Sequence, residues 1–190
     1  NLNNKQRCVF LDRDGVINID TDLIDRSEDL ELYPYAASSI RRLNKMGFLV
    51  VVVTNQSVIA RGLCTIATLD EIHKKMETEL GQEGAFVEAI YYCPHHPHSG
   101  YEGEVKEYKI ECNCRKPKPG MLLEAADRFN IDLTKSYLVG DSARDIEAGA
   151  RAGVETIRVK TGHGLKPHTE VPMHYVADLV AAVDLIEGQS

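Results

Sequence analysis

The fold is decided by a stretch near the start of the sequence that reads Arg7-Cys8-Val9-Phe10-Leu11-Asp12-Arg13-Asp14-Gly15. Residues 7–11 form a short apolar run, which predicts a buried strand that ends at Asp12. A stronger strand is predicted over residues 48–53, which include four consecutive valines and are followed by Thr54-Asn55-Gln56-Ser57. Both strands therefore end in polar side chains that are able to carry chemistry.

Strand-like and helix-like segments alternate along the rest of the chain. Further strands are predicted at 87–92, 136–139, 154–159 and 174–177. Helices are predicted at 35–46, from Thr65 or Thr68 to about Leu80, at 120–129, at 142–152 and near 179–186. This alternation predicts an α/β fold: a three-layer, doubly wound, Rossmann-like parallel sheet covered by helices on both faces. Such sheets bind ligands beyond the carboxyl ends of their strands.

Composition favours an ordinary globular domain. The chain has 190 residues, 43% hydrophobic and 27% charged, and no internal repeat or linker divides it, so we expect a single domain over residues 1–190. The net charge of −7 argues against nucleic-acid binding. The apolar runs are too short to span a bilayer, and no leader-like segment precedes the first strand. We expect a cytoplasmic monomer with a small-molecule partner.

Three carboxylates follow predicted strands. Asp12 and Asp14 follow the first, and Asp141 follows the strand at 136–139, with Asp145 one helical turn further on. Hard oxygen ligands of this kind suit Mg²⁺ together with a substrate phosphate. One carboxylate can act as the nucleophile and form an aspartyl-phosphate, and another, two residues away, can exchange protons with the leaving group and water.

Polar and cationic groups complete this predicted site. Thr54, Asn55 and Lys116 are able to hold the oxygens of a transferring phosphoryl group. Each motif alone is ordinary turn or helix-cap chemistry. Their joint occurrence at successive strand ends favours a catalytic site.

The set of motifs resembles the haloacid dehalogenase superfamily of phosphatases over nearly the whole chain. The matching segments are Val9 to Gly15, Val51 to Asn55, Lys116-Pro117, and Leu138 to Ser142 with Asp145-Ile146. The resemblance implies that Asp12 is the nucleophile and Asp14 the general acid/base. It also implies Mg²⁺ held by Asp12, the Asp14 carbonyl and Asp141, and phosphoryl stabilisation by Thr54 and Lys116. Asp145 would either support the residues that touch the substrate or be structural.

A large cap domain does not fit the spacing. Only 39 residues separate Asp14 from Thr54, and a helix and a strand use many of them. The site is therefore expected to be open.

A cysteine- and histidine-rich loop spans about residues 93–116. It contains Cys93-Pro94-His95-His96-Pro97-His98 and Cys112-Asn113-Cys114. Two close ligands, a spacer and two more close ligands are typical of a structural Zn²⁺ site. The alternative is free thiols beside solvated histidines. A catalytic zinc is disfavoured because four protein ligands leave no open position. Spacing does not decide which histidine binds.

The same loop resembles the heptose bisphosphate phosphatases, which implies Cys93, His95, Cys112 and Cys114 as the zinc ligands. His96 and His98 would then be non-ligands. Asn18-Ile19-Asp20 and the segment from Asn55 to Gly62 look like the substrate loops of that family. The resemblance implies that the substrate is bound by Asp20, Asn55, Gln56, Ser57, Arg61 and Arg115.

Arg61 and Arg115 are candidates for a second phosphate, because the guanidinium fork suits that group. The sequence departs from the family at Val58, which stands where glycine is common. It also departs at Asp22-Leu23-Ile24, where Gly-Tyr-Val is common.

The implied function is Mg²⁺-dependent removal of the 7-phosphate of D-glycero-D-manno-heptose 1,7-bisphosphate through an aspartyl-phosphate. It would serve nucleotide-heptose synthesis for lipopolysaccharide or another surface polysaccharide. The enzyme alternative is a histidinol-phosphate phosphatase. The non-enzyme alternative is a zinc-stapled binding module, against which the intact Asp12, Asp14 and Asp141 argue.

Overall fold

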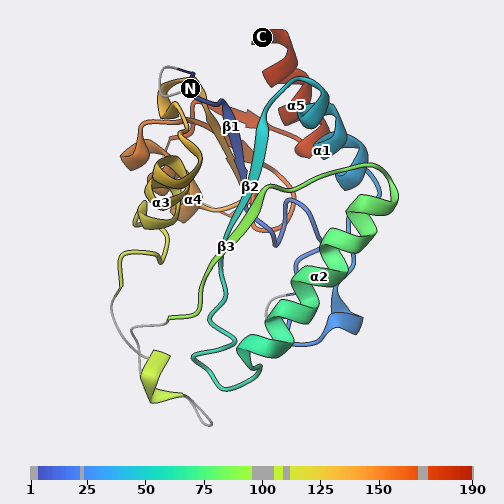
Figure 1. The fold of residues 1–190 in the computed structure, drawn as a ribbon, viewed down its shortest axis with the longest axis vertical. Helices are drawn as coiled ribbons and strands as arrows, with labels where there is room; N and C mark the ends of the chain where they lie inside the picture. Colours follow the sequence, from blue (N-terminus) through green and yellow to red (C-terminus); the bar gives the residue numbers. More distant parts are fainter. Residues whose placement is uncertain (1–3, 22–23, 96–104, 109–111, 167–170, 190) are drawn as a thin grey trace.

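A computed structural model describes residues 4–21, 24–95, 105–108, 112–166 and 171–189 (Figure 1). In this part of the chain one parallel sheet has the strand order β3-β2-β1-β4-β5-β6. Its strands are β1 (Cys8–Leu11), β2 (Leu49–Asn55), β3 (Ala89–Cys93), β4 (Tyr137–Gly140), β5 (Glu155–Val159) and β6 (His174–Val176). The chain runs outward from β1 to β3 and then returns to the other side of β1 at β4. A ligand crevice is therefore expected between the carboxyl ends of β1 and β4.

Helices cover both faces of the sheet, as the sequence predicted. They are α1 (Ala36–Lys45), α2 (Ile66–Gln82), α3 (Gly120–Phe129), α4 (Ala143–Ala152) and α5 (Leu179–Gln189). In Figure 1, α1 and α5 lie on the opposite side of the sheet from α3 and α4. Alternate residues of β1 face alternate layers: Val9 and Leu11 belong to the core cluster that includes α1, α2 and α5, whereas Cys8 and Phe10 pack in the cluster that includes α3. The three-layer α/β prediction is confirmed.

Capping side chains set the ends of the helices beside the site. Thr65 rather than Thr68 begins α2, because its side chain accepts a hydrogen bond from the Thr68 N–H. The helix ends at Gln82, slightly beyond the predicted end near Leu80. Ser142 begins α4 in a reciprocal capping box with Asp145, which places that carboxylate at the carboxyl edge of β4.

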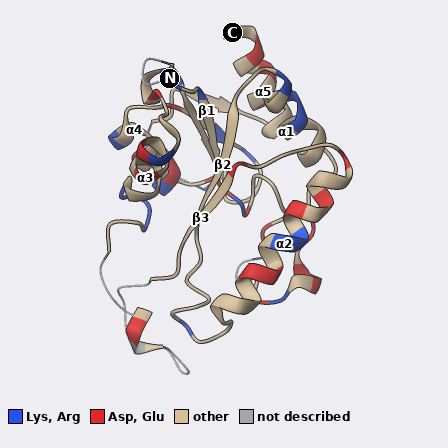
Figure 2. Cartoon of the chain, viewed as in Figure 1, with Lys and Arg blue, Asp and Glu red and all other residues tan. Residues whose placement is uncertain are grey.

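The loops between these elements carry little regular structure of their own. Within the described residues between β1 and α1, the structure has one short 3₁₀ turn, Ser27–Asp29. Val58 is buried and does not have a positive φ, so the loop after β2 does not need glycine at that position. The left-handed residue of this loop is Gly62, with a φ of +74°. Acidic and basic side chains are mixed along α2 (Figure 2). None of the described helices combines the length and apolarity needed to cross a bilayer.

Candidate active site

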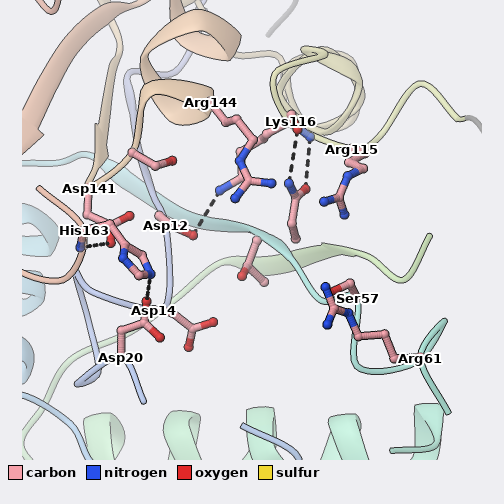
Figure 3. Close-up of a pocket in the computed structure, with 13 residues that line it drawn as sticks. Asp12, Asp14, Asp20, Ser57, Arg61, Arg115, Lys116, Asp141, Arg144 and His163 are labelled. Atoms are coloured by element: carbon pink, nitrogen blue, oxygen red, sulfur yellow. Dashed lines mark hydrogen bonds and ion pairs between the residues drawn. The ribbon is translucent and has the colours of Figure 1, made fainter. Parts of the chain in front are cut away.

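A cavity of about 480 Å³ lies at the carboxyl edge of the sheet (Figure 3). Its walls come from the loops after β1, β2, β4 and β5 and from the start of α4, together with the residues before α3. The lining residues are Asp12, Asp14, Asp20, Thr54, Asn55, Ser57, Arg61, Arg115, Lys116, Asp141, Ser142, Arg144 and His163. The crevice expected from the strand order is therefore real, and most residues singled out in the sequence lie in it.

The carboxylates of Asp12 and Asp141 are buried, with 8% and 2% of each residue exposed. Oxygen atoms of Asp12, Asp141 and Asp145 lie within 4.8 Å of one another. Burial, reinforced by the charge of Asp145, raises the pKa of Asp12 above its usual range and that of Asp141 to about 6. This crowding favours a cation between Asp12 and Asp141.

Gly15 allows the loop after β1 to approach Asp141 closely. Its φ is +84°, and a Cβ atom there would lie 2.2 Å from Asp141 Oδ2. Any larger residue would displace that carboxylate, so the glycine after Asp14 is a geometric requirement of the site.

Lys116 is a buried cation that lies beside Asp12. Its Nζ donates hydrogen bonds to Asp12 Oδ1 and the Val53 carbonyl, each at 3.0 Å, and a third to Asp145 Oδ1. Burial alone would lower the pKa of this ammonium group, but the two carboxylates raise it above its ordinary value. Asp145 Oδ2 accepts hydrogen bonds from Ser142 N and Oγ, so protein donors occupy both oxygens of Asp145. Asp145 therefore contacts Lys116 and the start of α4 and is not a lining residue of the cavity.

The carboxylate of Asp14 accepts hydrogen bonds from three neighbouring side chains. Its Oδ1 accepts hydrogen bonds from Arg13 Nε at 3.0 Å, Arg13 NH2 at 2.9 Å and Asn18 Nδ2 at 2.9 Å. Its Oδ2 accepts one hydrogen bond, from Gln56 Nε2 at 3.2 Å. The side chain is 19% exposed and lines the cavity. The carboxylate is thus fixed in orientation while part of it faces the space that a substrate would fill.

The three residues at the end of β2 and directly after it, Thr54, Asn55 and Gln56, contact different parts of the site. Thr54 lines the cavity, and its Oγ1 accepts a hydrogen bond from Gln56 Nε2 at 2.8 Å. Asn55 bonds the Lys116 main chain twice, accepting from its N–H and donating to its carbonyl oxygen. Gln56 is 3% exposed and is not a lining residue of the cavity. The amides of Asn55 and Gln56 therefore hold Lys116 and Asp14 in place.

The cysteine loop gathers four ligand atoms. One atom each from Cys93, His95, Cys112 and Cys114 lies within 4.8 Å of the others. The sulfur of Cys112 is 3.4 Å from those of Cys93 and Cys114, and the Cys114 sulfur is 3.4 Å from His95 Nδ1. A tetrahedral zinc with bonds of about 2.0–2.3 Å holds its ligand atoms roughly 3.5–3.8 Å apart. The sulfurs of Cys93 and Cys114 lie closer, at 2.7 Å, so a bound ion would have to move them apart. The donor set and the other separations fit Zn²⁺. His96 and His98 lie outside the described residues, as do Asp22 and Leu23.

The cysteine loop also places Arg115 against the cavity, where other cationic side chains lie nearby. Arg115 follows Cys114 directly, and its NH1 donates to the His95 carbonyl at 3.1 Å. Burial and the nearby Arg144 lower the pKa of the Arg115 guanidinium, and Arg61 adds to the effect. Figure 3 places Arg115 and Arg144 on one side of the cavity and Arg61 beside Ser57. An anion bound there would relieve the repulsion among these like charges.

Three lining residues, Ser142, Arg144 and His163, were not among the site residues predicted from the sequence. Arg144 stands on the first turn of α4, and His163 follows β5, where its Nε2 meets Asp20 Oδ2 at 2.8 Å and its N–H donates to Asp141 Oδ2 at 2.9 Å. The signal for His163 was available, since polar residues after a parallel strand are candidates and Lys160-Thr161-Gly162-His163 follows β5.

The fold and the site together define a hydrolase of the haloacid dehalogenase-like class. A hydrolase-like family model, described as HAD-hydrolase-like, matches residues 113–183. A D-glycero-β-D-manno-heptose-1,7-bisphosphate 7-phosphatase of Escherichia coli K12 is 42% identical over 175 residues, covering 92% of this chain and 90% of the relative. One of Vibrio cholerae is 45% identical over 164 residues, covering 86% and 84%.

A solved structure is similar throughout. The D,D-heptose 1,7-bisphosphate phosphatase of B. bronchiseptica, complexed with magnesium and phosphate, superposes with a TM-score of 0.86 at 38% identity, covering 97% of this chain and 100% of that one. The chain belongs to the family of the D-glycero-β-D-manno-heptose-1,7-bisphosphate 7-phosphatases.

Proposed function

We propose that this chain removes the 7-phosphate of D-glycero-β-D-manno-heptose 1,7-bisphosphate by way of an aspartyl-phosphate. The observation that carries the proposal is one cavity lined both by Asp12, Asp14 and Lys116 and by the cations Arg115 and Arg144. The first set of side chains suits phosphoryl transfer, and the second suits a remote anionic group. The names of the relatives supply the sugar, its β anomer and the position of the phosphate that is lost.

The proposed chemistry assigns one step to each carboxylate. An oxygen of Asp12 bonds to phosphorus while the bond from phosphorus to the sugar oxygen breaks, and Asp14 gives that oxygen a proton. Asp14 then takes a proton from a water molecule, whose oxygen bonds to phosphorus and releases Asp12. Arg13 N and Lys116 Nζ both donate to Asp12 Oδ1, which fixes the plane of the nucleophile.

Magnesium fits the carboxylate end. Asp12 and Asp141 offer hard oxygen atoms. Burial, together with the charge of Asp145, raises the pKa values of both, a cost that a cation would offset. With the Asp14 carbonyl, these are the proposed ligands. The bound ion would supply charge neutralisation for the phosphoryl oxygens. Thr54 Oγ1 and Lys116 Nζ are the chain's own groups placed for the same task.

Substrate preference tests the proposal. With Mg²⁺ present, kcat/KM for the β-heptose bisphosphate should exceed that for fructose 1,6-bisphosphate and for histidinol phosphate by 10-fold or more. Against histidinol phosphate, the physical reason is that binding energy from a remote phosphate is used to orient the reacting one. Fructose 1,6-bisphosphate also carries a second phosphate, so preference over it would come from the fit of the sugar and the placement of its two phosphates. Histidinol phosphate hydrolysed as fast as the heptose bisphosphate would favour the alternative phosphatase instead.

Arg115→Ala sharpens this test. A lost charge-assisted contact is worth about 1.5–3 kcal/mol, so kcat/KM for the bisphosphate should fall on the order of 10- to 100-fold. A heptose 7-phosphate without the second group should lose far less. Arg128→Ala, at an exposed position on α3, is the matched control and should change neither rate. Equal losses on both substrates would remove Arg115 from the remote-phosphate role.

We also propose that Cys93, His95, Cys112 and Cys114 hold one structural Zn²⁺. The support is the clustering of four soft or borderline ligand atoms around one point, with protein donors for all four positions. Because Arg115 and Lys116 follow Cys114 directly, the metal would anchor both cations beside the cavity.

Protein purified without chelators should contain about one zinc per chain. Cys114→Ser should lower the zinc content and lower the Tm by several degrees, since 1 kcal/mol shifts a domain of this size by about 2–4 °C. Cys64→Ser, outside the cluster, is the matched control and should keep its zinc. Metal analysis that finds no zinc in fully reduced wild-type protein would contradict the assignment.

A further inference from the structure

His73 is a polar residue on the apolar face of α2. The core-facing side chains of that helix include Leu69, Ile72 and Met76, and His73 lies one turn beyond Leu69. It is 5% exposed and projects from α2 toward the loop after β1. A buried imidazole costs free energy unless it has a partner, so its hydrogen bond is informative.

The partner of His73 is Arg13. His73 Nε2 lies 3.1 Å from Arg13 NH1, and Arg13 is completely buried. A guanidinium has only donors, so the imidazole nitrogen must accept, which makes His73 neutral with its proton on Nδ1. Burial and the adjacent Arg13 charge lower the pKa of His73 to about 3, which agrees with this assignment.

The other nitrogens of Arg13 lead to the catalytic end of the cavity. Arg13 Nε and NH2 both donate to Asp14 Oδ1, and NH2 also donates to Gln56 Oε1 at 3.2 Å. That last bond turns the Gln56 amide so that its Nε2 faces Asp14 Oδ2 and Thr54 Oγ1. Without the acceptor at His73, Arg13 NH1 would be buried and would lack a hydrogen bond. This unsatisfied donor costs free energy, which favours rotation of the guanidinium toward another acceptor and away from Asp14.

We propose that His73 is a positioning residue for the general acid/base: as a neutral acceptor it holds Arg13, and Arg13 orients the Asp14 carboxyl. Three donors occupy Oδ1, and this leaves Oδ2, with its single donor from Gln56, as the oxygen that exchanges protons with the leaving group and with water. The inference rests on the proposed phosphatase function and adds to it a residue outside the cavity.

The leaving group of the substrate provides the test. A sugar oxygen needs a proton as its bond to phosphorus breaks, whereas 4-nitrophenolate leaves without one, and kcat/KM reports the chemistry through that first step. In His73→Leu, kcat/KM for a sugar phosphate that the wild type hydrolyses should fall about 10-fold or more, because general acid catalysis contributes about 10²–10⁴-fold. The value for 4-nitrophenyl phosphate should fall less than threefold.

Two further variants complete the design. His73→Gln places an amide oxygen near the lost acceptor and should restore most of the sugar-phosphate rate. Ile72→Ala is the control, because Ile72 is a buried neighbour of His73 whose apolar side chain takes no part in the hydrogen bonds among His73, Arg13 and Asp14. This variant should lower stability but keep the ratio of the two rates. If His73→Leu does not fold, His73→Ala takes its place in the same comparison.

Each outcome decides between the ideas. Equal losses on both esters, or a His73→Gln variant as slow as His73→Leu, would overturn the positioning role while leaving the phosphatase function standing. A wild-type protein that hydrolyses neither 4-nitrophenyl phosphate nor the β-heptose bisphosphate would overturn the proposed function, and the role of His73 would fall with it.

Discussion

Asp12→Asn should leave a folded protein with almost no turnover. The amide is nearly isosteric with the carboxylate and is able to accept the same hydrogen bonds at its oxygen, but it is not a usable nucleophile toward phosphorus. Loss of a covalent nucleophile costs up to about 10⁶-fold, so we expect kcat to fall by on the order of 10⁴-fold or more. The measurement is phosphate release from the β-heptose bisphosphate at saturating Mg²⁺.

The control for this prediction is structural. Asp12→Asn should retain its zinc, because the cysteine cluster does not include Asp12. Its Tm should not fall below that of the wild type by more than a few degrees, since Lys116 keeps its contacts with Asp145 and the Val53 carbonyl. Activity within a few-fold of the wild type would remove Asp12 from the role of nucleophile.

Hydrophobic periodicity predicted the fold well because the sheet is buried on both faces. The continuous apolar run at residues 48–53, with its four valines, is typical of a strand that is buried on both faces. In the structure β2 pairs with β1 on one side and with β3 on the other. The helix at 120–129 agrees with the structure at both ends. Strand order was not predicted, because pairing of β1 with β4 depends on contacts far apart in the sequence.

The site was predictable where a residue directly follows a strand. Asp12, Thr54 and Asp141 reach the same cavity because parallel strands share a carboxyl edge. The hydrogen-bond partners of the side-chain amides that follow β2 were not predictable. Gln56 was predicted to bind substrate, and the structure directs its amide to Asp14 and Thr54, which only the hydrogen-bond partners reveal.

His73 illustrates the remaining limit of sequence reasoning. A histidine on an apolar helix stripe gives no indication of its partner, and Arg13 lies 60 residues away along the chain. The contact arises because α2 packs beside the loop after β1, which is a property of the assembled layers. Arg144 was missed for a similar reason, since an arginine on the first turn of a helix most often faces solvent.

Lys116→Met is the second change with a large expected effect, and it acts on two properties at once. The ammonium group stabilises the phosphoryl oxygens, and loss of one such buried donor costs about 10²–10³-fold in rate. It also neutralises Asp145, whose side chain is 1% exposed, and removing one partner of a buried ion pair costs about 3–5 kcal/mol. We expect kcat/KM and the free energy of unfolding to fall together.

A double variant separates the two effects. Adding Asp145→Asn to Lys116→Met removes the stranded carboxylate, while the new side-chain oxygen is still able to accept from Ser142 at the start of α4. The unfolding free energy, measured by urea titration, should recover by about 2 kcal/mol or more, because no unpaired charge stays buried at position 145. The rate should not recover, because the cation beside Asp12 is still missing. Recovery of both the unfolding free energy and the rate would show that Lys116 has a structural role and no catalytic one. The stabilisation of the transferred phosphoryl group would then have to come from Thr54 and the metal.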